Sequence, residues 1–281
     1  MNEQIKPNRS NNNTIRIVFI VIVVILLAAI FGFVFWAAHA AGPMPEALNA
    51  LESDEFIQVT IDDWYVFDPQ DIQTTTGLIL YPGGRVDPRS YAPQARLIAL
   101  HGYKVVIVPM PLNLAVFGAS KASQVMDTYP EITQWVVGGH SLGGAMAANF
   151  AHASPDRVNG LLLWAAYPAA SDDLSTSTIP VTSIYASRDG LATPDKIAAS
   201  RQLLPSDADF RLIEGGNHAQ FGWYGPQKGD NEATITREQQ QAEVVEGSLE
   251  LLFRVTDLEG LPKSSGFLLP QILLAKSKYT P

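Results

Sequence analysis

The feature that most constrains the fold of this chain is the sequence Gly-His-Ser-Leu-Gly at residues 139–143. Before it, Trp135–Val137 is a short apolar run that predicts a strand. After it, Leu142–Ala153 is small and apolar, which is typical of a helix packed closely on a sheet. Glycines two residues before and two residues after Ser141 remove side chains that would clash in a tight turn. The pattern predicts that the Ser141 hydroxyl points out over the edge of a sheet, as a candidate nucleophile.

A glycine-rich turn between a strand and a helix can also cradle a phosphate group without any reaction. The sequence lacks the Gly-x-Gly-x-x-Gly pattern of dinucleotide-binding proteins and the lysine of a nucleotide-binding P-loop. We therefore favour the nucleophile interpretation of Ser141. The free N–H groups at the start of the following helix would stabilise negative charge that develops on a substrate.

Strand and helix signals alternate along most of the chain after residue 55. Apolar runs predict strands at Phe56–Ile61, Trp64–Phe67, Leu78–Tyr81, Val105–Val108, Trp135–Val137, Leu161–Ala165, Val181–Tyr185 and Phe210–Ile213. Helices are expected at Tyr91–Leu100, Ala119–Asp127, Leu142–Ala153, Pro194–Leu204 and from Thr236, where Gln239 completes a capping box. The first two strands are expected to form an antiparallel pair. The alternation predicts an α/β fold with a mostly parallel sheet of about seven or eight strands and helices on both faces.

A nucleophilic serine needs a base, and the base needs an acid that orients it. Of the histidines at 39, 101, 140, 152 and 218, His218 directly follows the last predicted strand, where parallel strand ends share one edge. Asp189 is the only carboxylate in the turn after the preceding strand. The rival acids are Asp172 and Asp173, which fit a solvated loop, and Asp195, which suits the start of the next helix. The predicted triad is Ser141, Asp189 and His218, in the chain order of the α/β-hydrolases.

The sequence also suggests where an oxyanion and a substrate would bind. One donor would be the backbone N–H of Leu142, and the second would come from the turn after Leu78–Tyr81, at Gly84 or Arg85. An ordinary Pro-Gly turn is the alternative at that position. Trp223 and Tyr224 follow the base closely, and they either line a substrate groove or cover the edge of the sheet.

Four motifs together resemble the α/β-hydrolases, and within them the small, capless α/β-hydrolase fold-5 family. They are Tyr81–Gly84, Gly138–Gly144, Ser187–Gly190 and Glu214–Gly222, of which Gly-Gly-Asn-His-Ala-Gln-Phe is the most specific part. The resemblance extends over roughly Phe56 to Arg254 and implies a serine hydrolase with esterase-like chemistry. Dienelactone hydrolases are similarly capless, but they have cysteine as the nucleophile, and this chain has Ser141.

Three further observations bound the function. The segment between the strands ending at Ala165 and beginning at Val181 has only 15 residues, too few for a cap domain, so an open site is expected. The net charge of -9 argues against nucleic acid as a partner. The absence of cysteine excludes thiol nucleophiles, disulfide scaffolds and Cys-ligated metals. We expect no metal and no organic cofactor.

The N-terminal region contains an uncharged run of 22 residues, Ile17–Ala38, which is long enough to span a bilayer core. The residues before it carry a balance of +2, and residues 39–55 contain acidic but no basic residues. This asymmetry predicts a single-pass signal anchor in the cell membrane, with the N-terminus in the cytoplasm and the rest outside. The alternative is a secreted protein, because Ala38-His39-Ala40 has the small-x-small pattern of a signal-peptide cleavage site.

The expected organisation is a cytoplasmic tail at 1–16, a membrane helix at 17–38, a linker at 39–54 and a hydrolase domain at 55–281. The expected function is hydrolysis of a small-molecule carboxylic ester or related acyl compound, with the bilayer as a partner of residues 17–38. An acyltransferase that uses the same triad and an inactive, membrane-tethered binding module remain alternatives. The sequence leaves open the natural substrate, the oligomeric state and the role of the tail at 263–281.

Overall fold

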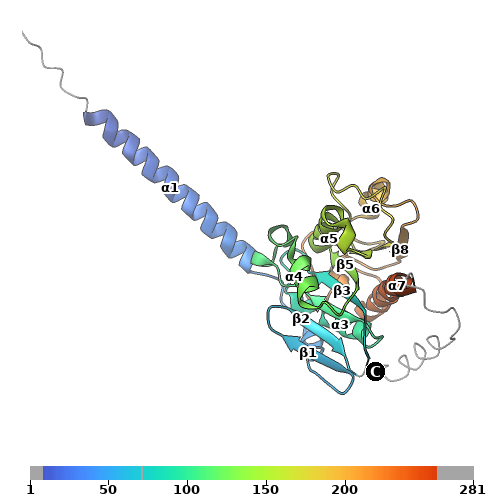
Figure 1. The fold of residues 1–281 in the computed structure, drawn as a ribbon. Helices are drawn as coiled ribbons and strands as arrows, with labels where there is room; N and C mark the ends of the chain where they lie inside the picture. Colours follow the sequence, from blue (N-terminus) through green and yellow to red (C-terminus); the bar gives the residue numbers. More distant parts are fainter. Residues whose placement is uncertain (1–8, 71, 258–281) are drawn as a thin grey trace, which may run out of the picture.

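The computed structural model describes residues 9–70 and 72–257. In this part of the chain, eight strands form one sheet with the order β1-β2-β4-β3-β5-β6-β7-β8 (Figure 1). The pairs β1–β2 and β2–β4 are antiparallel, and all pairs from β4 to β8 are parallel. The strands are β1 (Ile57–Ile61), β2 (Tyr65–Pro69), β3 (Thr76–Tyr81), β4 (Lys104–Ile107), β5 (Gln134–His140), β6 (Gly160–Trp164), β7 (Val181–Ala186) and β8 (Asp209–Ile213). The predicted fold class, including the opening antiparallel pair, is confirmed.

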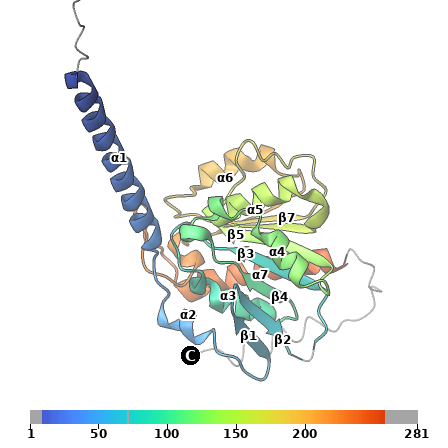
Figure 2. The same cartoon turned by 60° about the vertical axis from the view of Figure 1, so that its left-hand side comes forward.

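Helices cover both faces of the sheet (Figure 2). One buried cluster contains apolar residues of α3 and α7, and the other contains those of α4 and α5. Because both faces are covered, the central strands are apolar on both sides, and β3 and β6 are buried along their whole length. The helices are α1 (Arg9–Ala38), α2 (Pro45–Asn49), α3 (Ala92–Ala99), α4 (Lys121–Thr128), α5 (Leu142–Ala153), α6 (Pro194–Ser200) and α7 (Arg237–Asp257).

The predicted capping box at the start of α7 is present. The Thr236 N–H donates to the Gln239 side chain at 2.9 Å, and the Gln239 N–H donates to the Thr236 hydroxyl at 3.2 Å. These reciprocal bonds satisfy two of the backbone donors that a helix start leaves without intrahelical partners.

Strand β5 is longer than its sequence pattern predicted. It continues through Gly138 and Gly139 to His140, all of which pair with β6. Glycine is uncommon inside strands, so the apolar pattern alone ended this strand at Val137. The packing explains the exception, because a Cβ atom on Gly138 would lie 2.6 Å from the Cβ and the carbonyl oxygen of Leu162.

Helix α1 projects away from the domain as a long rod (Figure 2). Its residues Asn13–Ala38 are long and apolar enough to cross a membrane. The segment expected as a linker at 39–54 is built into the domain. Ala41 forms a β-bridge with Val86, Pro43 forms one with Tyr224, and α2 buries its alanine at position 47.

The connection from β6 to β7, residues 165–180, contains no helix or strand, as expected for a domain without a cap. The C-terminal tail at 263–281 lies outside the described residues.

Candidate active site

Ser141 occupies the sharp turn between β5 and α5. Its backbone has φ of 53° and ψ of -122°, a left-handed φ that residues with a side chain rarely adopt. The Ser141 N–H donates to the Trp164 carbonyl at 2.9 Å, and its own carbonyl accepts from the Ala145 N–H at 3.0 Å. The strained conformation is therefore held by β6 on one side and by α5 on the other.

The glycines of the pentapeptide are required by close backbone packing. A Cβ atom on Gly143 would lie 2.2 Å from the Tyr81 carbonyl oxygen, and one on Gly139 would lie 2.6 Å from the same atom. These contacts are with backbone, which cannot rotate away. The turn that carries Ser141 therefore packs directly against the last residue of β3, Tyr81.

His218 and Asp189 form a buried hydrogen-bonded pair. The distance from His218 Nδ1 to Asp189 Oδ2 is 2.8 Å, and both side chains are fully buried. The second carboxylate oxygen, Oδ1, accepts from the backbone N–H groups of Leu191 and Ala192, each at 2.7 Å. These bonds fix the carboxylate in a position from which it can orient the imidazole.

The two ring nitrogens of His218 have different environments. Nε2 is buried and makes no hydrogen bond within the described part of the chain. The ring of His140, the residue before Ser141, lies 4.5 Å from the His218 ring between centroids. The structure thus brings His218, the candidate base, close to the turn of Ser141, although no hydrogen bond joins the two residues in the described structure. Such catalytic bonds are often long or poorly aligned until a substrate is bound.

His140 is held as a neutral, buried side chain. Its Nδ1 lies 2.8 Å from the Tyr91 hydroxyl, which also accepts from the Gly83 N–H at 3.0 Å. Burial lowers the pKa of His140 well below its usual value, and the neighbouring His218 lowers it further. A neutral His140 places no competing positive charge beside the imidazole of His218.

The candidate oxyanion donors differ in their hydrogen bonding. The N–H of Leu142 lies at the start of α5, and neither it nor the N–H of Gly84 has a hydrogen-bond partner in the described structure. The two residues lie close together, as a Cβ atom added to Gly84 would be 3.1 Å from Leu142 Cδ2. The N–H of Arg85 instead donates to the Asn113 carbonyl at 2.7 Å. Gly84 is therefore the candidate with a free donor in this turn.

The two aromatic residues after the base have different environments. Trp223 is partly buried, and its backbone bonds to the Ser90 carbonyl and the Met44 N–H at 2.7 and 2.9 Å. Tyr224 is fully buried, with its ring 6.3 Å from that of His140, and it lines a cavity described below.

None of the rival carboxylates is hydrogen-bonded to His218 in the described structure. Asp172 was expected in a solvated loop, but it is only 4 % exposed, because it accepts from the Asn149 side chain at 3.0 Å. Asp173 bonds the backbone of Ser175, and Asp195 lies in the first turn of α6. Among the hydrogen bonds of the described residues, only that of Asp189 joins a carboxylate to His218.

Asp230 is a further residue at the site that the sequence analysis did not identify. Its Oδ1 accepts from the Gly190 N–H at 3.0 Å, and its Oδ2 accepts from the Ala219 N–H at 2.9 Å. These donors belong to the residues directly after Asp189 and His218. One carboxylate therefore connects the turn that holds the acid with the loop that holds the base.

Helix α7 also binds the loop that carries His218. The Gln240 side chain accepts from the Asn217 N–H at 3.0 Å and donates to the Asn217 carbonyl at 2.8 Å. Asn217 precedes His218, so the base is fixed on both sides. No sequence signal identified Asp230 or Gln240, because each acts on a segment distant in the chain.

No metal centre accompanies this arrangement in the described part of the protein, where no group of three or more His, Asp or Glu side chains could hold an ion. The groups that this site offers for chemistry include the serine, the histidine, the carboxylate and the backbone donors.

Comparison with known proteins identifies the family. A family model described as the alpha/beta hydrolase family matches residues 77–242, which include the elbow, Asp189 and His218. The chain belongs to the alpha/beta hydrolase family. The resemblance expected from the motifs is thereby confirmed. No curated protein matches the sequence.

Solved structures share the fold of this alpha/beta hydrolase at low sequence identity. The esterase domain of a Rhodothermus marinus protein is 15% identical with a TM-score of 0.54, and the match covers 68% of this chain and 92% of that one. A thermophilic esterase from Thermogutta terrifontis is 14% identical with a TM-score of 0.52, covering 73% and 99%. Est1E from Butyrivibrio proteoclasticus, with ferulic acid bound, is 12% identical with a TM-score of 0.54, covering 72% and 98%.

Proposed function

We propose that this alpha/beta hydrolase is a serine esterase that cleaves a carboxylic ester or related acyl substrate through an acyl-enzyme on Ser141. The observation that carries the proposal is the buried His218–Asp189 pair, because the His218 ring lies 4.5 Å from the ring of His140, the residue before Ser141, and His218 Nε2 has no hydrogen-bond partner among the described residues. The esterases that share the fold support the choice of an ester substrate.

In the proposed mechanism, the Ser141 hydroxyl attacks the ester carbonyl while His218 Nε2 accepts its proton. Asp189 stabilises the imidazolium that forms. The N–H groups of Leu142 and Gly84 would donate to the oxyanion of the tetrahedral intermediate. The intermediate collapses, His218 returns the proton to the departing alkoxide, and the alcohol leaves.

Water then completes the turnover. His218 removes a proton from a water molecule, which attacks the acyl carbon, and the second intermediate releases the carboxylic acid and restores the Ser141 hydroxyl. No metal or organic cofactor takes part in these steps.

We further propose that α1 anchors the protein in the cell membrane, with the N-terminus in the cytoplasm and the catalytic domain outside. The length of the apolar segment and the charges on its two sides support this orientation. The contacts at the end of α1 favour a retained helix over cleavage near Ala40. The Arg85 side chain donates to the carbonyls of Trp36 and His39 at 3.0 and 2.8 Å, and cleavage after Ala40 would remove both of these partners.

Fluorophosphonate labelling of the full chain in detergent tests the proposed chemistry. We expect a stoichiometric adduct on Ser141, located by peptide mass mapping. Ser141→Ala should abolish it, whereas the matched change Ser120→Ala, at an exposed serine before α4, should leave it intact. A folded protein that is not labelled would refute the proposal.

A further inference from the structure

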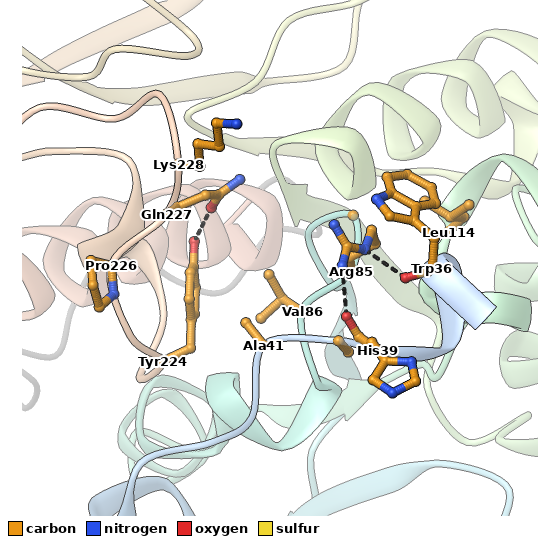
Figure 3. A pocket seen from close by; sticks show the side chains of 12 residues that line it. Trp36, His39, Ala41, Arg85, Val86, Leu114, Tyr224, Pro226, Gln227 and Lys228 are labelled. Carbon is orange, nitrogen blue, oxygen red and sulfur yellow. Dashed lines mark hydrogen bonds between the residues drawn. The ribbon is translucent and has the colours of Figure 1, made fainter. Parts of the chain in front are cut away.

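A cavity of about 500 Å³ opens between the end of α1 and the loops that carry Gly84 and Tyr224 (Figure 3). One wall comes from the last turn of α1 and the residues after it, and the other comes from the catalytic domain. The membrane helix and the domain therefore build this cavity together. Its lining residues are Trp36, His39, Ala40, Ala41, Gly84, Arg85, Val86, Leu114, Tyr224, Pro226, Gln227 and Lys228.

The cavity adjoins the candidate oxyanion site. Gly84 belongs to its wall and lies against Leu142, the residue after the nucleophile. On the other side, the buried ring of Tyr224 lies between the cavity and His140. A molecule in the cavity would thus reach the turn that carries the free N–H of Gly84.

The cavity is fixed at the end of the membrane helix. Arg85 binds the carbonyls of Trp36 and His39 (Figure 3), and its guanidinium lies 4.3 Å from the centre of the Trp36 ring. Asn113 donates to the carbonyl of Ala37 at 3.2 Å. These bonds satisfy carbonyls that a helix end leaves without intrahelical partners.

The catalytic domain also contacts α1 at a point before the end of the helix at Ala38. The Phe117 ring contacts the Phe33 ring edge to face, with 6.4 Å between centroids. Phe33 precedes Ala38 by five residues, which corresponds to about 7.5 Å along a helix. Phe117 is 53% exposed, and its neighbour Val116 is 49% exposed. Exposed apolar side chains of the domain therefore lie beside the last apolar turns of α1. With α1 in a membrane as proposed, the cavity at its end therefore lies at the level where the bilayer meets water.

The lining of the cavity suits an amphiphile. Val86, Leu114 and the Trp36 ring provide apolar surface for an acyl chain. Arg85 and Lys228 provide positive charge, and no carboxylate belongs to the wall in the described structure. In a chain of net charge -9, two cations without an acidic neighbour in the wall favour an anionic group.

We propose that the substrate is an ester-linked lipid with an anionic headgroup, drawn from the leaflet at the Ala38 end of α1. The inference rests on the proposed esterase function and specifies its substrate. The reaction breaks the acyl C–O bond, and water supplies the hydroxyl of the released fatty acid and the proton of the headgroup-bearing alcohol.

The full chain in vesicles provides the test. Fatty-acid release is measured from phosphatidylglycerol and from phosphatidylcholine with identical acyl chains, with p-nitrophenyl acetate as a soluble ester. We expect phosphatidylglycerol to be hydrolysed at least 10-fold faster than phosphatidylcholine. Equal rates on the two lipids would overturn the assignment of an anionic headgroup.

Two matched variants connect the lipid reaction with the cavity. Ala40→Trp fills the cavity with an indole ring, and we expect it to lower lipid hydrolysis at least 10-fold more than hydrolysis of the soluble ester. Ala38→Trp introduces the same ring at an exposed residue outside the lining and should leave the ratio of the two rates unchanged. An unchanged ratio in Ala40→Trp would overturn the role of the cavity.

The remaining outcomes separate the two proposals. Labelling at Ser141 with turnover of the soluble ester but none of either lipid would overturn only the lipid substrate. Absence of both labelling and soluble-ester turnover would refute the esterase function, and the lipid proposal would fall with it.

Discussion

The Nδ1 atom of His218 lies 2.8 Å from Oδ2 of Asp189, and neither side chain has solvent-accessible surface. Because the carboxylate also accepts two backbone N–H groups through Oδ1, it can only meet the histidine with Oδ2. In the proposed mechanism the imidazole proton is therefore on Nδ1, and Nε2 is the acceptor for a proton from Ser141.

Asp189→Asn should prevent His218 from acting as a base, although the asparagine side chain has nearly the same shape as the aspartate. An amide facing His218 can donate a hydrogen bond to Nδ1, which moves the ring proton to Nε2 and removes the base. We expect kcat for ester hydrolysis to fall on the order of 10⁴-fold. Steady-state kinetics would measure the change, with Asp195→Asn in the first turn of α6 as the control. A variant that retains a tenth of the activity would contradict the assignment of Asp189 as the acid.

Gly143→Ala should destabilise the protein through a backbone clash. The new Cβ atom would lie 2.2 Å from the Tyr81 carbonyl oxygen and 2.4 Å from that of Pro82. We expect the free energy of unfolding to fall by about 3 kcal/mol or more. Urea unfolding followed by circular dichroism would measure it. At Gly225 no atom lies within 4 Å of an added Cβ, so Gly225→Ala should change stability by less than about 0.5 kcal/mol.

Asp230→Asn should slow catalysis while leaving substrate binding nearly intact. The amide offers one acceptor where the carboxylate offered two, so the N–H of Gly190 or of Ala219 loses its partner. A resulting shift of Asp189 against His218 should lower kcat about 10- to 100-fold with little change in KM. Asp207→Asn, at an exposed position, provides the control. Equal loss in both variants, or an effect confined to KM, would argue against a positioning role for Asp230.

The buried His140 should make the protein less stable in mild acid. Its pKa in the folded state lies below the ordinary value of 6.5, so below that pH the unfolded chain binds a proton that the folded chain does not. Stability should therefore fall as the pH decreases, by up to about 1.4 kcal/mol per pH unit from this group. His140→Gln removes this contribution. Urea unfolding between about pH 7 and pH 5 should give a shallower loss for the variant, and parallel curves would contradict the prediction.

The parts of the site that could be predicted from sequence depend on local backbone geometry. The turn at Ser141 needs small neighbours, so its glycines are visible in the pattern. Asp189 and His218 follow consecutive strands of a parallel sheet, and such strands end at one edge. Position along the chain was therefore sufficient to bring these residues to the same edge of the sheet.

The parts that could not be predicted depend on contacts between distant segments. Asp230 bonds to Gly190, 40 residues away, and nothing in the intervening sequence marks the pair. Arg85 was considered only for its backbone N–H, yet its side chain reaches 49 residues back to the carbonyl of Trp36. The burial of Asp172 likewise follows from its bond to Asn149 on α5, because a polar stretch alone does not reveal such a partner.

Ala41, which forms a β-bridge with Val86, is only three residues beyond the end of α1 at Ala38. The helix is therefore joined to the domain without a long linker. A protein held in a bilayer by this helix would meet a lipid substrate, as proposed above, in two dimensions. Its rate would then follow the number of substrate molecules per unit area of surface, and not their number per unit volume. Mixing in inert lipid would slow turnover even when the total amount of substrate in the sample is unchanged.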